Sequence, residues 1–228
     1  GYQRLRRLDS TGVVRTMTGN DFFGAWGVAI DRRARLLYFT DLLYHQVLKI
    51  DLNQQNATPQ VIAGSPDFRP GFRGDGGPAT AALVRSPQGI TVAPNGVDAQ
   101  GNLFFVEGFG RVRRISGGRV ETIAGQATLS TGFAGDGGLA TQARMDTPVS
   151  LALDPGGNIV VADTFNNRLR QLTVVRQQAP AAIQITRGNN QSGTVSTVLA
   201  TPLTVRVAAA NGDPIPAVRV TFTVLQGS

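Results

Sequence analysis

The sequence predicts an all-β protein, a partial β-propeller of four-stranded antiparallel blades followed by the first strands of an incomplete β-sandwich. Three observations lead to this prediction. A long motif occurs twice, apolar residues alternate with polar ones in short runs, and the composition changes near residue 180. Repeats at a fixed offset indicate supersecondary units that bury their apolar faces by stacking on their neighbours.

The repeated motif is GFRGDGGPATAALVRSP at residues 71–87, which returns as GFAGDGGLATQARMDTP at residues 132–148. Phe72 therefore returns as Phe133, an offset of 61 residues. After the motif come an alternating run, a second apolar run, an acidic residue and a basic strand. These parts lie at 87–125 and at 148–172. A third copy lies at 25–50 and lacks the GDGG loop. Residues 4–19 are similar to the closing strands of one more copy.

Each copy contains short runs that alternate at a period of two, and this pattern predicts strands with one buried face. Gly, Asn and Pro separate the runs and supply turns. Residues 78–85 are the best candidate for a single helical turn, because Pro78 is tolerated at a helix start. Four-stranded units in radial array form a propeller, which leaves only short, protected sheet edges.

These motifs resemble the NHL-repeat family of propellers. The pattern GDGG-x-A-T-x-A-x-x-x-x-P, followed by an apolar run, D-P-x-G-N and A-D-T-x-N-x-R, stands at residues 135–170. The copy at 74–114 departs from it by an insertion near 95–99 and by Glu107-Gly108-Phe109 in place of Asp-Thr-x-Asn. The resemblance implies about three and a half blades within residues 1–176 and further blades in a longer chain.

The residues after a linker at 177–180 differ in composition, with less Arg and more Thr and Val. Residues 181–228 contain two alternating runs joined by Asn-Gly-Asp-Pro, a turn signal. They resemble the N-terminal part of a bacterial Ig-like domain of the invasin/intimin type. Such a sandwich needs roughly 100 residues, so the domain is expected to be incomplete here. The resemblance implies a secreted or cell-surface protein with further Ig-like domains in the full chain.

The composition excludes several kinds of site. The chain has no cysteine, which rules out disulfides and thiolate-ligated metals. No run is long and apolar enough to suggest a membrane span. The formal net charge is +7, but stacking aromatics are few, so nucleic-acid binding is not expected. The R-x-R pairs, Arg111 with Arg113 and Arg168 with Arg170, are expected to coat outer strands and to pair with acids.

Four residues of the repeated motif are candidates for ligand binding: Phe72, Asp75, Phe133 and Asp136. Glycines flank both aspartates, so the loops could present carboxylates and backbone groups to a ligand or to Ca²⁺. One carboxylate per loop is sparse for Ca²⁺, which takes six to eight oxygens. The favoured interpretation is structural, a tight glycine turn in which Asp caps local N–H groups.

A second set of residues is predicted to shape the repeat without acting chemically. The members are Gly74, Gly76, Gly77, Gly135, Gly137, Gly138, Asp41, Asp163, Asn166 and Arg168. His45, the single histidine, falls in the register of Asn167 and is expected in a surface turn. One histidine cannot build a multi-histidine metal site or a Ser-His-Asp triad. We therefore expect no catalytic residue, no metal and no cofactor.

The residues and the resemblances together favour a non-catalytic scaffold that binds a protein or carbohydrate ligand. It would belong to an exported bacterial multidomain protein at the surface or secreted, with adhesion as a possible task. One alternative is a propeller lyase or lactonase whose metal ligands lie on other blades. Another alternative is the extracellular sensor module of a receptor. Ligand identity and blade number do not follow from the sequence, because a fold hosts many functions.

Overall fold

A computed structural model describes residues 4–17, 24–54, 57–93, 102–126, 131–172, 182–187 and 204–208. The chain divides into two compact units, Gly1–Val174 and Val175–Ser228. The first unit contains strands β1 to β13 and the second contains β14 and β15. The helices in the described residues are single 3₁₀ turns, so the prediction of an all-β protein is confirmed.

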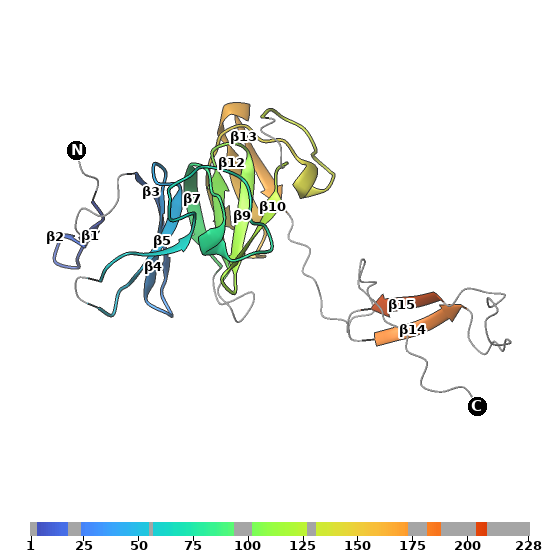
Figure 1. Ribbon diagram of the computed structural model, residues 1–228, viewed down its shortest axis with the longest axis horizontal. Coiled ribbons are helices and arrows are strands. Elements are labelled where there is room, and N and C mark those ends of the chain that lie inside the picture. Colours follow the sequence, from blue (N-terminus) through green and yellow to red (C-terminus); the bar gives the residue numbers. More distant parts are fainter. Residues whose placement is uncertain are drawn as a thin grey trace. The chain divides into compact units, whose positions relative to one another are not determined.

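The first unit is a row of antiparallel sheets that follow one another in chain order (Figure 1). It opens with the N-terminal hairpin, strands β1 (Arg6–Leu8) and β2 (Val14–Thr16). Blade 1 follows, with strands β3 (Ala25–Asp31), β4 (Leu36–Asp41), β5 (Gln46–Asp51) and β6 (Gln60–Ala63). Each strand pairs with the next along the chain, which is the order of a propeller blade.

Blades 2 and 3 repeat the same order. Blade 2 has β7 (Pro87–Val92), β8 (Leu103–Glu107), β9 (Arg111–Ser116) and β10 (Arg119–Ala124). Blade 3 has β11 (Pro148–Leu153), β12 (Ile159–Asp163) and β13 (Arg168–Leu172). Residues 173–181, which follow β13, lie outside the described part of the chain. The predicted strand regions and the partial propeller are thus confirmed.

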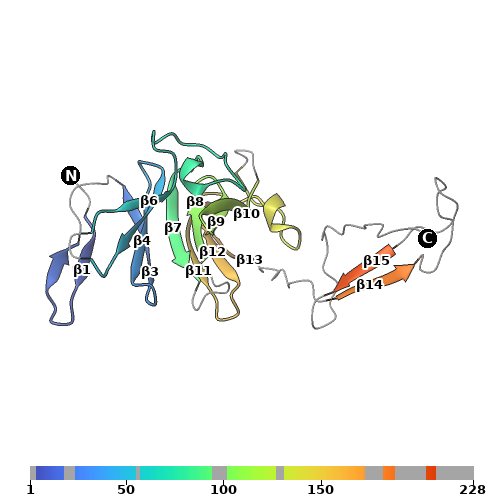
Figure 2. The ribbon, with the colours of Figure 1, turned by 60° about the horizontal axis from the view of Figure 1, so that its bottom comes forward.

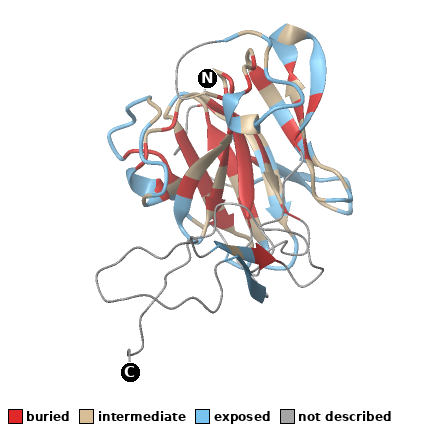
Figure 3. Ribbon diagram, turned by 90° about the vertical axis from the view of Figure 1, so that its right-hand side faces the viewer, coloured by how far each residue is buried: buried red, intermediate tan, exposed pale blue. Residues whose placement is uncertain are grey.

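Apolar clusters between successive sheets hold the row together. Figure 2 shows the sheets of the first unit in their chain order, and Figure 3 shows buried residues along their strands. One cluster packs the N-terminal hairpin on blade 1, a second packs blade 1 on blade 2, and a third packs blade 2 on blade 3. Their largest members include Phe39, Phe105 and Met145. Stacking of this kind is what the repeats predicted, because one blade alone cannot bury both of its faces.

The crossover loops are residues 64–86, between blades 1 and 2, and residues 131–147, which enter blade 3. Each contains one 3₁₀ turn, η1 (Ala79–Ala81) or η2 (Ala140–Gln142). Gly64 donates its N–H to the Ala79 carbonyl, as Gly125 does to Ala140. The helical turn predicted within 78–85 is therefore present, and it anchors the end of the preceding blade.

The second unit contains one antiparallel pair in its described part, β14 (Ala182–Arg187) with β15 (Thr204–Ala208). The predicted Asn-Gly-Asp-Pro turn, at residues 211–214, lies outside the described residues. The division at Val174 falls close to the linker expected at 177–180. Among the described residues, no helix has the length and apolar character to cross a bilayer.

Candidate functional site

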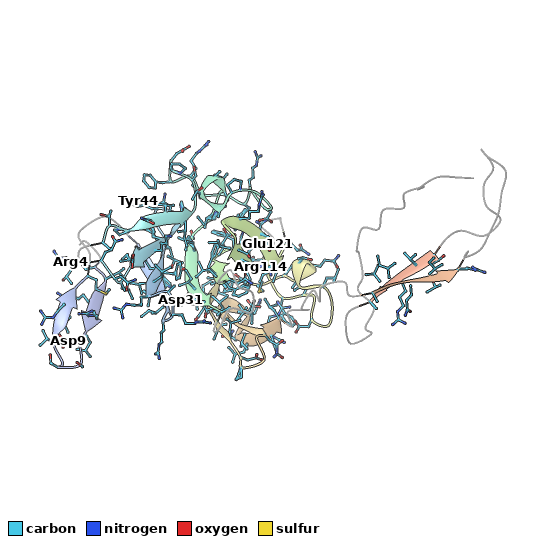
Figure 4. All side chains as sticks on the ribbon, turned by 90° about the horizontal axis from the view of Figure 1, so that it is seen from below. Arg4, Asp9, Asp31, Tyr44, Arg114 and Glu121 are labelled. Atoms are coloured by element: carbon cyan, nitrogen blue, oxygen red, sulfur yellow. The ribbon has the colours of Figure 1, made fainter. Side chains whose placement is uncertain are left out.

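The candidate site is one end of the blades, here called the crossover rim. It comprises the crossover loops and the three turns that join the second and third strands of the blades, residues 42–45, 108–110 and 164–167. Gly108 donates its N–H to Ser86, and Phe165 donates its N–H to Asp146, so turns and loops meet at this end. Tyr44 marks the rim in Figure 4, and Asp31 marks the opposite end of blade 1.

Arg113 ties the first crossover loop to blade 2 from inside the protein. Its side chain is fully buried on β9. The guanidinium donates to the Asp75 carboxylate at 2.6 Å, to the Leu83 carbonyl at 3.1 Å and to Glu107 at 3.4 Å. A buried guanidinium needs such acceptors, because charge removed from water without partners is costly.

Arg170 makes the corresponding connection in blade 3. It donates to Asp136 at 2.5 and 2.9 Å and to Asp163 at 3.4 Å. It also donates to the backbone carbonyls of Ala134 and Arg144 in the loop. The two GDGG aspartates thus have the same role, to accept a bond from the buried arginine of the blade that their loop enters.

Two expectations about these residues were wrong. Arg111, Arg113 and Arg170 do not coat the outer strands, because all three are buried. The hydrogen bonds recorded for Asp75 and Asp136 come from these arginines and not from local N–H groups. The carboxylates are partly exposed, and in both cases the recorded contacts use Oδ1. Asp75 and Asp136 are therefore structural residues that form ion pairs with distant strands, and they do not form Asx turns.

Blade 1 has neither the loop nor the arginine. The position of Arg113 and Arg170 is occupied there by Leu48, which is buried in the cluster beneath the N-terminal hairpin. The GDGG loop is also missing before this blade. Among blades 1 to 3, loop aspartate and strand arginine are both present in blades 2 and 3 and both absent from blade 1, which is what a mutual electrostatic requirement predicts.

The acid at the end of each second strand is buried in all three blades. Asp41 accepts bonds from the N–H groups of Leu43 and Tyr44, which shapes its turn. Asp163 accepts from the Asp146 N–H at 2.7 Å and from the Asn166 amide at 2.9 Å. Asp41 and Asp163 thus organise the turns that follow them. Asp163 pairs with Arg170, whereas Arg168 extends over the rim.

The Glu107 carboxylate has fewer hydrogen-bond partners than the Asp163 carboxylate. Its Oε1 accepts from the Arg85 N–H at 3.0 Å and from Arg113. Its Oε2 and the Nε of Arg113 have no hydrogen-bond partner within the described part of the chain. The departure of the sequence to Glu107-Gly108-Phe109 explains this, because no side-chain amide stands where Asn166 does. Burial raises the pKa of Glu107 to about 7, although Arg113 opposes the shift.

The three glycines of the first GDGG loop differ in what they permit. Gly74 has φ +100°, and a Cβ there would lie 2.8 Å from the Ala82 Cα. Gly76 has φ +78° with open space around it, and Gly77 donates its N–H to the Gly74 carbonyl. Only Gly74 has both a positive φ and too little space for a Cβ. The second loop repeats these features at Gly135, Gly137 and Gly138.

Arginine and phenylalanine stack at equivalent rim positions. Arg111 lies over the Phe72 ring at 4.3 Å, and Arg168 lies over Phe133 at 3.9 Å. Arg85 adds a third contact, 4.0 Å from the centroid of Phe109. Cation–π contacts of this kind fix both partners and contribute about 0.5–1 kcal/mol at exposed sites. Phe72 and Phe133 are therefore held in place, and Phe133 still has an exposed face.

An apolar residue also follows the buried acid by two positions in every blade: Leu43, Phe109 and Phe165. Leu43 is 58% exposed and Phe165 is 68% exposed. The prediction of site residues missed all three because they do not belong to the repeated GDGG motif. Alignment of the blades on their acids would have found them.

His45 lies in the turn of blade 1 with φ +57°, as Asn167 does in blade 3 with φ +52°. This agrees with the register assigned to it from the sequence. Its Nδ1 accepts a bond from the Ser86 N–H at 3.1 Å, so it joins the turn to the crossover loop. Burial and the charge of Arg85 lower its pKa.

The described residues contain no cluster of three or more His, Cys, Asp or Glu side chains that could hold a metal ion. Asp75, Glu107, Asp136 and Asp163 all pair with the two buried arginines. The rim presents outward aromatic and aliphatic side chains, the stacked guanidinium of Arg168 and the partly exposed carboxylates of Asp75 and Asp136. Such a surface is suited to recognition of another molecule.

Comparison with known proteins supports the repeat assignment. Residues 145–172 match the NHL repeat. Teneurin-1 of Mus musculus is 31% identical over 163 residues, which cover 63% of this chain and 6% of the teneurin. Teneurin-3 of Danio rerio is 35% identical over 191 residues, which cover 77% of this chain and 7% of the teneurin. The chain thus spans about 6–7% of the length of these relatives.

Two solved structures share the fold. An auxiliary nutrient binding protein from Bacteroides thetaiotaomicron has a TM-score of 0.56 at 18% identity, covering 75% of this chain and 42% of that protein. An auxiliary nutrient binding protein from Bacteroides ovatus has a TM-score of 0.57 at 20% identity, covering 71% and 40%. At these identities the likeness concerns the fold alone.

We predict unequal effects of alanine at the GDGG glycines. Gly76→Ala should lower the free energy of unfolding by about 1–2 kcal/mol, the cost of a left-handed backbone with a side chain. Gly74→Ala should cost at least about 1 kcal/mol more, because its Cβ also collides with Ala82. Urea denaturation measures both, with Gly77→Ala as the control. Equal losses at Gly74 and Gly76 would contradict this account of the loop.

We also predict a pH dependence that originates in Glu107. Its pKa is about 7 in the folded protein, above the ordinary value of 4.5. The folded state therefore holds the proton more tightly, so this contribution to stability is present below about pH 4.5 and is lost as the pH rises to about 7. Between pH 5 and 8 the wild type should lose roughly 2 kcal/mol relative to Glu107→Gln. Urea titrations at both pH values test this; parallel profiles would exclude it.

Proposed function

We propose that this protein is a non-catalytic binding scaffold and that the crossover rim is its binding face. The observation that carries the proposal is the apolar residue that recurs two positions after the buried acid, exposed in Leu43 and Phe165. Scattered apolar residues on a surface need no explanation, but repetition at one end of successive blades does. Phe133 and the guanidinium of Arg168 extend the same surface.

The loops and turns of the rim are also tied to buried charged groups, which favours binding. The buried arginines hold the crossover loops, and Asp41 and Asp163 hold the turns of blades 1 and 3. A preordered surface loses little conformational entropy when a ligand binds. Because the exposed apolar groups lie on separate blades, we favour a protein partner, which can contact several turns at once, over a small sugar.

We propose a secreted or cell-surface setting, in a bacterial multidomain protein with an adhesive task. The support is the resemblance of residues 181–228 to a bacterial Ig-like domain of the invasin/intimin type. The antiparallel pair β14–β15 is compatible with the start of such a sandwich. In this proposal residues 1–176 present the rim, residues 177–180 are a linker, and residues 181–228 begin a spacer domain.

The binding proposal predicts a ligand that depends on the rim. The wild type, a Leu43→Ser/Phe165→Ser variant and a Val13→Ser control would be immobilised and tested against purified extracellular proteins and polysaccharides. Val13 is an exposed residue of the N-terminal hairpin, away from the three rim turns. We expect a protein ligand whose affinity falls at least tenfold in the double variant, about 1.4 kcal/mol, and is unchanged in the control.

Other outcomes distinguish the alternatives. A ligand that binds all three proteins equally would contradict the assignment of the rim. A polysaccharide lost in the double variant would keep the rim and change the class of partner. Turnover of a lactone by the wild type would contradict the non-catalytic assignment.

A further inference from the structure

His45 of blade 1 is hydrogen-bonded to the crossover loop that enters blade 2. Its Nδ1 accepts a bond from the Ser86 N–H at 3.1 Å. An imidazole nitrogen that accepts a hydrogen bond carries no proton, so this contact requires the neutral ring with its proton on Nε2. Protonation of Nδ1 would remove the acceptor and place two donors against each other. The tie between blade 1 and the loop therefore depends on the charge of one side chain.

At the next junction, between blades 2 and 3, the backbone makes the corresponding contact. Thr147 corresponds to Ser86, and both have a positive φ, +48° and +46°. Gly110 corresponds to His45, since each is the last residue of its turn and has a positive φ. A Cβ at Gly110 would lie 2.5 Å from the Met145 carbonyl oxygen, so the turn lies against the loop and leaves no space for a side chain. At the first junction a titratable side chain takes this place.

Ser86 is held in a strained conformation by two hydrogen bonds. Its φ of +46° lies in the left-handed region, which is unfavourable for a residue with a Cβ. Strain of this kind persists where the surrounding structure enforces it. His45 accepts a bond from the Ser86 N–H, and the Ser86 carbonyl accepts a bond from the Gly108 N–H. Loss of the first bond would leave one tie and allow this backbone to relax.

Arg85, the residue before Ser86, connects this contact to the surface of the rim. Its N–H donates to Glu107 at 3.0 Å. Its guanidinium lies 4.0 Å from the centroid of the Phe109 ring and 5.6 Å from that of Phe72. Cation–π attraction requires a distance within about 6 Å, so a shift of the backbone at 85–86 would change these contacts. The segment that His45 holds therefore arranges the aromatic surface between blades 1 and 2.

Two charged side chains act on the His45 ring from the elements packed around it. Arg85 lies on the crossover loop, and Asp41 ends strand β4. Burial lowers the pKa of His45 from 6.5, Arg85 lowers it further, and Asp41 raises it. Because the net shift of the pKa is downward, the folded protein disfavours the charged ring. The contribution of this bond to stability is therefore present above about pH 6.5 and is lost as the pH falls through the lower pKa of the folded protein.

We propose that His45 is an acid-sensitive latch of the crossover rim. The neutral ring holds the Ser86 N–H, and protonation of the ring releases residues 85–86 together with the stack of Arg85 on Phe109. The charged ring also repels the Arg85 guanidinium, which favours the released arrangement. The rim thus has one arrangement at neutral pH and another in mildly acidic surroundings. That this change regulates binding rests on the proposed function, whereas the latch itself does not.

The single histidine of the chain makes the latch directly observable. The isotope-labelled 228-residue protein, without any ligand, would be titrated by NMR from about pH 7.5 to about pH 5. We expect the imidazole signals to titrate with a midpoint below 6.5 and the Ser86 amide signal to move with the same midpoint. The Nε–H signal of Arg85 should lose the ring-current shift caused by Phe109 over the same range. Amide exchange at Ser86, corrected for its intrinsic rate, should be at least tenfold faster at the acidic end.

Two variants separate His45 from the neighbouring carboxyl group. His45→Asn removes the titrating ring and supplies a residue that tolerates the left-handed conformation, as Asn167 does at φ +52°. In this variant the Ser86 and Arg85 signals should not titrate over the same pH range. Glu107→Gln removes the other titratable acceptor of the segment, and the midpoint of Ser86 should remain that of His45. The comparison of wild type with Glu107→Gln decides the question even if His45→Asn fails to fold.

Three results would overturn the proposal. The first is a Ser86 amide signal that does not move while His45 titrates. The second is a His45 midpoint at or above 6.5, which would show that no buried hydrogen bond keeps the ring neutral. The third is a Ser86 titration that disappears in Glu107→Gln, which would assign the change to Glu107. Because no ligand is present in these titrations, failure of the latch and failure of the proposed binding function are distinguishable.

Discussion

Each long crossover loop is joined to the blade it enters by one buried guanidinium, that of Arg113 or Arg170. Both arginines are removed from water and must find acceptors inside the protein. An aspartate of the GDGG loop, loop carbonyls and the acid of the second strand supply them. The loop cannot move away without leaving a buried cation unpaired. The positions of the two crossover loops on the rim depend on this constraint.

Variation among the blades shows how strict the constraint is. Blade 3 has the complete set of partners, including the Asn166 amide on Asp163. Blade 2 lacks the amide and leaves Glu107 Oε2 without a partner in the described part of the chain, and burial of this carboxyl raises its pKa. Blade 1 lacks the loop and replaces the arginine with Leu48.

The fold could be predicted from the sequence because its signals are local and repeated. The period of two gave the strands, and the return of Phe72 as Phe133 gave the stacking. The roles of the arginines could not be predicted in this way, because charge in a strand ordinarily indicates solvent. Burial of Arg113 depends on Asp75, which is 38 residues away along the chain, and no local pattern encodes that contact. The joint absence of loop and arginine in blade 1 was the available signal.

The most direct test of this account is a double-mutant cycle between Arg113 and Asp75, followed by urea denaturation. Arg113→Leu reproduces the residue of blade 1, and Asp75→Asn keeps the size of the loop side chain. We expect Arg113→Leu to cost about 3–5 kcal/mol, because Glu107 loses its buried partner. The double variant should be more stable than the sum of the single losses by about 0.5–3 kcal/mol. Additive losses, or a loss below about 1 kcal/mol in Arg113→Leu, would show that the buried guanidinium does not hold the loop.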